Sequence, residues 1–293
     1  MSLAGKLGRL AGPLYLLLVA LAYVMGAGVS RYLGFPLRDR LLILGLVVAL
    51  LLQLAMDWLN AGMRPLTEPL NKGEAREERA RTRKAAFLGG IAALAATAAL
   101  AYAIIWLDGA SPAAILCLGL SLVAIVLYAV PPMRANDRGF GELLLAVQIA
   151  YLAPSLGFLL QAQDSHLLLN VCTVALTFLL IATLVVLALP RYDEDTRRGR
   201  ITLLTRMGWQ RALTVHHALL AAGYMLLGIS TLQAFSFSLI GPALLTVPFA
   251  VLQVLLLRGI ANGAKPIWNL LRANALAIFG LTTYFLTLSF WLR

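Results

Sequence analysis

The chain has 293 residues, of which 61% are hydrophobic and 13% charged, and its mean hydropathy is +0.85. This composition excludes an ordinary soluble globular domain, in which about 25% of residues are charged. The net charge of +11 does not indicate nucleic-acid binding, because membrane proteins gather basic residues in their cytoplasmic loops. We therefore expect an all-α polytopic membrane protein with no nucleic-acid partner.

Apolar segments of spanning length follow one another along the chain. Runs of about 20 residues suit helices, which satisfy their backbone groups internally, and are too long for barrel strands. We predict nine transmembrane helices in a single domain, residues 1–293, with no separate soluble domain. The predicted spans are residues 10–30, 41–61, 85–107, 112–130, 140–162, 167–189, 210–232, 239–257 and 267–292.

The loop charges predict the orientation. With the N-terminus inside, nearly all Lys and Arg residues fall on the cytoplasmic side. The exceptions are Arg31, Arg38, Arg40 and Arg293 outside, and Arg272 within the last span. We expect the N-terminus and two long charged loops, residues 62–84 and 190–209, in the cytoplasm, and the C-terminus outside.

The first charged loop begins with a polar cluster at the end of the second span. Asp57 and Asn60 lie three residues apart, hence on one helical face, and Arg64 follows four residues later. The segment "RPLTEPLNKG" then brings Lys72. Residues 74–84, "EAREERARTRK", are of mixed sign and typical of a positive-inside determinant.

The second charged loop, "LPRYDEDTRRGRITLLTRMG", covers residues 189–208. If the sixth helix continues through it, Arg191 and Asp195 share a face while Asp193 points elsewhere. Two interpretations of the carboxylates stay open. They form a surface ion-pair cluster, contributing about 0–1 kcal/mol per pair, or they bind a divalent cation, since Mg²⁺ takes oxygen ligands and bridges to substrate phosphates.

A third segment, "LYAVPPMRANDRGFGELLLAVQ" at residues 127–148, joins the fourth and fifth spans on the same side. With the two charged loops it resembles the UbiA superfamily of intramembrane aromatic prenyltransferases. The similarity lies in Tyr-x-x-Pro-Pro-x-Arg (Tyr128 to Arg134), Gly-x-Gly-Glu (ending at Glu142) and Asp-x-x-x-Gly-Arg-x-Thr-Leu (beginning at Asp195). These motifs occur in the family's order, and the resemblance covers nearly the whole chain.

The resemblance implies a UbiA-like helical bundle around a lipid-facing cavity, with a prenyl diphosphate and Mg²⁺ held between two aspartate-rich motifs. It implies that the catalytic residues are Asp57, Asn60, Asp193 and Asp195, with the metal on Asp57, Asp193 and Asp195. The implied substrate contacts are Arg64, Lys72, Tyr128, Arg134, Arg138, Glu142, Gln148, Arg191 and Arg200. For Arg134, Arg138 and Arg200 a contact with anionic lipid is the alternative.

The aspartate-rich motifs are degenerate in this chain. The family's first motif is similar to Asn-Asp-x-x-Asp-x-x-x-Asp, whereas this chain has Met56, Asp57, Asn60 and Arg64. In the second motif, the acid that the family has four residues before the last Asp is replaced by Arg191. A guanidinium matches phosphate geometry bidentately, so one interpretation is that Arg64 and Arg191 bind the diphosphate beside a single Mg²⁺.

The opposing interpretation is that Arg191 pairs with Asp195 and Arg64 with Glu68, giving a catalytically silent relative. Four polar residues within spans, Gln148, Asn170, Gln253 and Asn274, indicate a cavity or an interhelical hydrogen bond, of which the hydrogen bond is favoured. Gln148 is the exception, because it lies two turns below Glu142 and is expected to face an acceptor.

We predict transfer of a polyprenyl group from its diphosphate to an aromatic acceptor in the membrane, such as a dihydroxynaphthoate or hydroxybenzoate precursor of a quinone. The alternative is a silent UbiA-like protein that binds a lipid, quinone or pigment, or serves as a structural subunit of a membrane complex. A transporter is disfavoured because the motifs gather on one side and no Gly/Pro-interrupted helix pair lies at midplane.

Overall fold

The computed structural model describes residues 3–65, 76–233 and 235–293. Within these residues the chain is helical without strands, and nine helices are long and apolar enough to cross a membrane. Their number and order confirm the predicted spans. Six of the spans are single helices: α2 (Pro13–Tyr32), α3 (Asp39–Gly62), α5 (Pro112–Ala129), α8 (Leu167–Ala188), α11 (Trp209–Gln233) and α14 (Trp268–Trp291). The other three spans are α4 (Arg76–Ala103) with η1 (Ile104–Asp108), α6 (Gly141–Val147) to α7 (Ala153–Leu159), and α12 (Phe237–Leu244) with α13 (Val247–Ala261).

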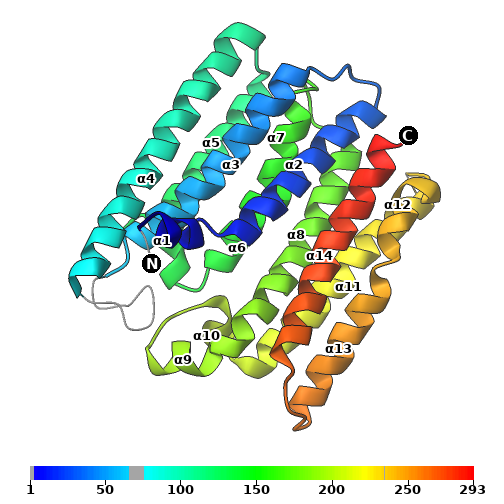
Figure 1. Cartoon of the computed structure of the whole chain (residues 1–293). Helices are drawn as coiled ribbons and strands as arrows, with labels where there is room; N and C mark the ends of the chain where they lie inside the picture. Colours follow the sequence, from blue (N-terminus) through cyan, green and yellow to red (C-terminus); the bar gives the residue numbers. More distant parts are fainter. Residues whose placement is uncertain (1–2, 66–75, 234) are drawn as a thin grey trace.

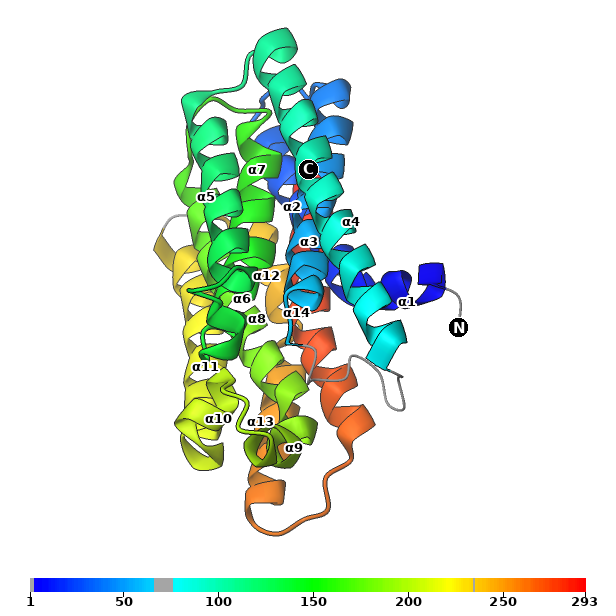
Figure 2. The ribbon, with the colours of Figure 1, turned by 90° about the vertical axis from the view of Figure 1, so that its left-hand side faces the viewer.

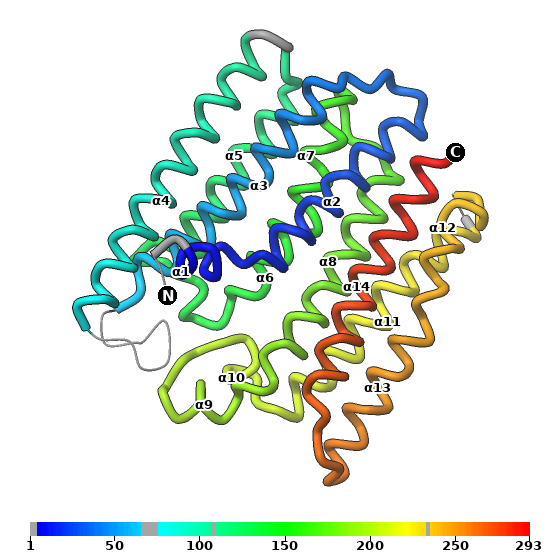
Figure 3. The backbone as a smooth tube through the Cα atoms, viewed as in Figure 1, coloured from blue at the N-terminus to red at the C-terminus, as the bar shows by residue number. Residues whose placement is uncertain are grey.

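The spans lie side by side in one bundle (Figures 1 and 3). Helices α3, α4 and α5 form one edge, α11 to α14 form the other, and α2 and α8 lie between them. The short helix α1 (Leu3–Leu10) runs across the spans rather than along them (Figure 2). It is held there by the Trp58 indole N–H, which donates to the Leu7 carbonyl at 3.2 Å, and by an ion pair between Lys6 and Glu78.

Prolines interrupt two spans that the sequence predicts as continuous. In the fifth span a π-helical turn, η3 (Gln148–Leu152), separates α6 from α7, whose second residue is Pro154. In the eighth span α12 contains Pro242, and α13 starts beside Pro248. Proline has no N–H to donate and clashes with the preceding turn, so the helical hydrogen bonds change there.

Close backbone packing joins α2 to α7. A Cβ atom added at Gly26 would lie 1.9 Å from the Pro154 carbonyl oxygen, so only glycine allows this approach. At the other edge, buried polar groups connect the helices: Asn274 donates to Gln253 at 2.6 Å, and the Tyr224 hydroxyl lies 2.8 Å from that of Thr246. The interhelical hydrogen bond predicted for Gln253 and Asn274 is confirmed.

Candidate functional site

A cavity of about 450 Å³ opens at the end of the bundle where α3, α5 and α8 finish and α2 and α6 begin. Its polar lining contains four arginines and three carboxylates: Arg9, Arg64, Arg191, Arg200, Asp57, Glu142 and Asp195. Its apolar lining includes leucines from α1, α6 and α8: Leu10, Leu145, Leu184 and Leu187. The cavity is therefore amphipathic, with an excess of positive charge among its polar groups.

The structure brings together most of the residues that the motifs single out. Those that line the cavity are Asp57, Asn60, Arg64, Tyr128, Glu142, Arg191, Asp195 and Arg200. Those that do not line it are Arg134, Arg138, Gln148 and Asp193. Lys72 is a predicted substrate contact, and Glu68 is the partner of Arg64 in the silent interpretation. Both lie outside the described residues.

The first motif occupies the last two turns of α3. Asp57 accepts a hydrogen bond from the Gln53 amide at 3.1 Å, one turn deeper in the bundle. On its other side the α1–α2 turn approaches closely, since a Cβ atom at Gly12 would lie 2.7 Å from Asp57 Oδ2. Asn60 is 8% exposed and accepts from the Asn136 amide at 3.0 Å, which ties α3 to the loop after α5.

The second motif follows directly from α8. The helix passes through a 3₁₀ turn, η4 (Leu189–Arg191), into α9 (Tyr192–Arg197). As the spacing predicts, Arg191 and Asp195 face the cavity. Asp193 instead is exposed and lies in a shallow surface depression with Tyr192, Thr196 and Arg197. Helical periodicity therefore separates the two acids, and Asp193 is away from the other predicted ligands.

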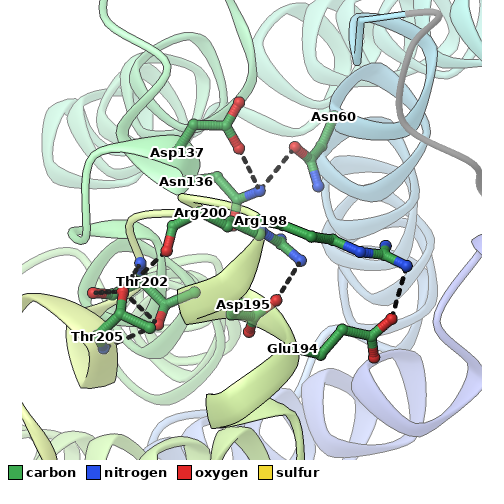
Figure 4. A network of polar contacts seen from close by, with 9 residues as sticks. All are labelled: Asn60, Asn136, Asp137, Glu194, Asp195, Arg198, Arg200, Thr202 and Thr205. Carbon is green, nitrogen blue, oxygen red and sulfur yellow. Dashed lines mark hydrogen bonds and ion pairs between the residues drawn. The ribbon is translucent and has the colours of Figure 1, made fainter.

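Asp195 is paired with Arg200 rather than with Arg191. It is 8% exposed, and its Oδ1 lies 3.8 Å from Nη1 of Arg200, while the Arg200 backbone N–H donates to the Asp195 carbonyl at 2.9 Å (Figure 4). The pair between Arg191 and Asp195, which the silent interpretation requires, is not formed between these two described residues. The neighbouring pair of Glu194 and Arg198, at 2.7 Å, is exposed.

The loop after α5 and the loop after α9 are joined to each other. Arg138 and Ile201 form an isolated parallel bridge, and Glu142 Oε2 accepts from the Leu203 backbone N–H at 3.2 Å. The Arg206 guanidinium lies 4.3 Å from the centre of the Phe140 ring. Glu142 thus has a structural contact in addition to its place in the cavity wall, and it links the segments that carry the second and third motifs.

Arg134 and Arg138 are engaged within their own loop. Arg134, with a positive φ of 33°, places its Nε 3.0 Å from Oδ2 of Asp137, and Arg138 donates to the Pro132 carbonyl at 2.7 Å. Arg138 is also exposed. The predicted phosphate contacts at these two positions are therefore not part of the described cavity, because local contacts orient both guanidinium groups.

Gln148 lies deeper than the cavity, where the π-helical turn begins. It is 2% exposed, and its Oε1 has no hydrogen-bond partner in the described residues. Leu145 lines the cavity, and Gln148 follows three residues later on the same helical face. Gln148 therefore lies beyond the cavity, deeper in the bundle.

The donor set has a clear consequence for metal binding. Among the residues that the structure describes, no group of three or more His, Cys, Asp or Glu side chains could hold a metal ion. All three cavity carboxylates also have protein partners: Gln53 for Asp57, Leu203 for Glu142 and Arg200 for Asp195. The residues do not form an all-protein metal cage. They do fit Mg²⁺ bound through one or two carboxylates and completed by water and substrate phosphates, which is how this ion is usually held.

Four polar residues of the cavity wall are not among the predicted site residues: Arg9, Tyr15, Asn136 and Thr202. Arg9 has the pattern of a charge flanking the first span, but Gly12, with a φ of 54°, turns α1 back so that Arg9 and Tyr15 both reach the cavity. The Gly-Pro pair before the first span was the available signal, since it predicts a break in the helix.

In the part of the chain that the structure describes, these features define a class: an integral membrane bundle of nine spans with an arginine-rich amphipathic cavity at one end. No protein-family profile and no curated protein sequence matches the chain. Solved structures do match along its whole length. One, described as a UbiA homologue from Archaeoglobus fulgidus bound to GPP and Mg²⁺, is 20% identical, with a TM-score of 0.72 over 98% of this chain and 100% of that one.

A second structure of the Archaeoglobus fulgidus homologue is 19% identical, with a TM-score of 0.69 over 98% of this chain and 100% of that one. A structure described as a digeranylgeranylglyceryl phosphate synthase is 12% identical, with a TM-score of 0.61 over 100% of this chain and 98% of that one. The chain therefore has the UbiA fold, and the resemblance predicted from its motifs is confirmed at the level of the fold.

Proposed function

We propose that this protein binds a prenyl diphosphate in the cavity and transfers the prenyl group to an acceptor in the membrane. The observation that carries the proposal is the amphipathic lining, which combines four guanidinium groups with leucines of α6 and α8. A prenyl diphosphate has the same two kinds of group, an anionic head and an apolar tail. Support also comes from the structures of the same fold that are described as bound to GPP or DMAPP with Mg²⁺.

The arginines have a defined part in this proposal. Arg64 lies just beyond the end of α3, and Arg191 ends the 3₁₀ turn that follows α8, so they approach the cavity from different parts of the chain. A guanidinium donates two parallel hydrogen bonds to phosphate oxygens, which fixes the diphosphate in orientation as well as position. Both arginines stand where the motifs of the UbiA superfamily have an acid. We infer that they contact the diphosphate directly instead of binding metal, so that a single Mg²⁺ suffices.

Asp57 and Asp195 are the residues that would hold this ion, and when bound it supplies Lewis-acid stabilisation of the leaving diphosphate. The bond between prenyl C1 and the diphosphate oxygen breaks with its electron pair on the diphosphate. The acceptor then forms a bond to C1 and loses a proton. The arginines stabilise the charge that accumulates on the diphosphate, and the apolar lining excludes water from the allylic cation.

The acceptor that we propose is an aromatic quinone precursor, of the dihydroxynaphthoate or hydroxybenzoate type. Its ring supplies the electron-rich carbon that the cation needs. Because one structure with this fold is described as a digeranylgeranylglyceryl phosphate synthase, the fold by itself does not select an aromatic acceptor. We further propose that residues 1–293 form one domain, with the N-terminus and the cavity on the cytoplasmic side, as the loop charges predict.

The test is a product assay with purified protein in liposomes. Isotope-labelled geranylgeranyl diphosphate is supplied with dihydroxynaphthoate, hydroxybenzoate or a glyceryl phosphate acceptor, and both diphosphate release and product mass are measured. We expect an aromatic prenylated product that is lost on chelation and in Asp195→Ala. Product from the glyceryl phosphate acceptor alone would correct the acceptor class, and binding of diphosphate without any product would contradict the enzymatic proposal.

A further inference from the structure

Gln53 is a glutamine in the interior of α3 whose position the motifs do not explain. Its side chain is completely buried, and its Oε1 has no hydrogen-bond partner in the described part of the chain. A buried polar group without a partner costs about 1–3 kcal/mol, and membrane helices keep polar residues mostly where they bond or serve function. The burial of Gln53 therefore needs a favourable contact or a function, and the amide group of its side chain makes such a contact.

The Gln53 amide donates to Oδ2 of Asp57, four residues later on the same helical face, at 3.1 Å. In the described residues this is the one hydrogen bond that the Asp57 carboxylate makes. The direction of the bond also fixes the rotamer of Gln53, because a carboxylate accepts only from the amide nitrogen. The carbonyl oxygen of Gln53 is consequently turned away from Asp57 and left without a partner.

The same carboxylate oxygen has a second close neighbour. A Cβ atom at Gly12 would lie 2.7 Å from Oδ2 of Asp57, so the α1–α2 turn lies close to this atom. Oδ2 thus has both the Gln53 amide and the Gly12 backbone as neighbours. Asp57 lines the cavity whereas Gln53 does not, so Oδ1 is the oxygen left for a ligand.

We propose that Gln53 is a positioning residue that orients Asp57 so that Oδ1 faces the cavity and binds Mg²⁺ together with the prenyl diphosphate. The inference rests on the proposed function, and it concerns the cation rather than the phosphate contacts. Gln53 touches neither ligand and acts through Asp57. Partners that orient a ligating carboxylate change metal affinity by about 10- to 100-fold when removed.

The test uses Gln53→Met, which keeps the length and volume of the side chain but cannot donate. Gln253→Met is the matched control, because Gln253 is equally buried in α13 and bonds to Asn274 at the other edge of the bundle. Binding of a non-hydrolysable geranylgeranyl thiodiphosphate is measured with purified protein over a range of Mg²⁺ concentrations and in the presence of chelator.

For Gln53→Met we expect the half-saturating Mg²⁺ concentration to rise about tenfold or more, with unchanged affinity in chelator. Gln253→Met should match the wild type in both measurements. In an Asp57→Ala background, Gln53→Met should have no further effect, because the residue it orients is absent.

The inference is overturned if Gln53→Met resembles Gln253→Met, if it weakens binding equally with Mg²⁺ and with chelator, or if its effect adds to that of Asp57→Ala. These results leave the proposed function intact as long as the wild type binds. A wild type that binds no thiodiphosphate under any condition would overturn the proposed function and this inference together.

Discussion

The two degenerate motifs meet at one cavity, but the structure holds them in different ways. The first lies on the regular, membrane-embedded end of α3, where Gln53, Gly12 and Asn136 contact Asp57 or Asn60. The second lies beyond α8, on the six residues of α9 and the loop that follows. There Arg191 is exposed, and Asp195 is paired with the partly exposed Arg200.

This difference suggests a division of labour. The carboxylate of the first motif is preorganised by a bundle that has no room to repack. The arginines of the second motif, Arg191 and Arg200, flank α9 in a segment where most side chains are exposed, and such segments open at lower free-energy cost than core helices. We expect the first motif to set the position of the cation and the second to close on the diphosphate. The predictions below test this contrast, from the largest effect to the smallest.

Replacing Asp57 should have the largest effect. We expect Asp57→Ala to weaken Mg²⁺-dependent binding of the thiodiphosphate about 100-fold, because removing one partner of a buried charged contact costs about 2–5 kcal/mol. Asp39→Ala is the control, since Asp39 is exposed at the opposite end of the same helix. Calorimetry or a competition assay measures both variants. Equal losses in both would mean that the effect comes from α3 stability rather than from the site.

Arg191→Ala should weaken binding about 10- to 100-fold both with and without Mg²⁺, since hydrogen bonds to charged groups contribute about 1.5–3 kcal/mol. The control is Arg197→Ala, an exposed arginine on α9 that lies outside the cavity. Binding isotherms at two ionic strengths separate the specific contact from general attraction, which salt screens. An unchanged affinity of the Arg191→Ala variant would contradict the proposed contact between the Arg191 guanidinium and the diphosphate.

The two aspartates of α9 should differ because only Asp195 lines the cavity. We expect Asp195→Asn to weaken Mg²⁺-dependent binding about tenfold, as expected for a contact worth about 1.4 kcal/mol. Asp193→Asn should be nearly silent, because Asp193 is exposed in a separate depression. The two variants make the same substitution at positions that are two residues apart, so each serves as the control of the other. If Asp193→Asn had the larger effect, α9 would have to turn when the substrate binds.

Substitution of Glu142 tests the hydrogen bond that links the two loop segments, not the binding of the ligand. Glu142→Leu leaves the Leu203 N–H without its acceptor, which should lower the free energy of unfolding by about 1–3 kcal/mol. Glu142→Gln keeps an acceptor oxygen and should lose less. Thermal unfolding in detergent compares the two variants. Equal stability of Glu142→Leu and wild type would show that the contact at 3.2 Å contributes nothing to the fold.

Much of the architecture follows from the sequence. Apolar length and loop punctuation predict all nine spans, because the bilayer requires helices of that length. Helical periodicity also separates Asp195 from Asp193 before any coordinates are known, and the structure places them on different sides of α9. The motifs select eight residues that line the cavity.

Long-range packing and the geometry of turns account for the rest. The Gly-Pro pair predicts a break before the first span, but not that Arg9 and Tyr15 then line the same cavity as Asp57, because that depends on how separate elements meet. The pairing of Asp195 with Arg200, five residues later, depends on the turn that follows α9. The same holds for Arg134 and Arg138, whose basic character fits a phosphate contact but whose loop directs them to Asp137 and Pro132. Charge alone does not predict the direction of a side chain.

The most direct test of the central claim is the location of a bound prenyl diphosphate. A thiodiphosphate with a photoreactive tail is cross-linked to the protein in liposomes, and labelled peptides are identified by mass spectrometry. We predict labelling of α6 and α8 around Leu145 and Leu184, suppressed by excess unlabelled thiodiphosphate and reduced in Arg191→Ala. Labelling confined to the lipid-facing side of other helices, or unaffected by the competitor, would contradict the account.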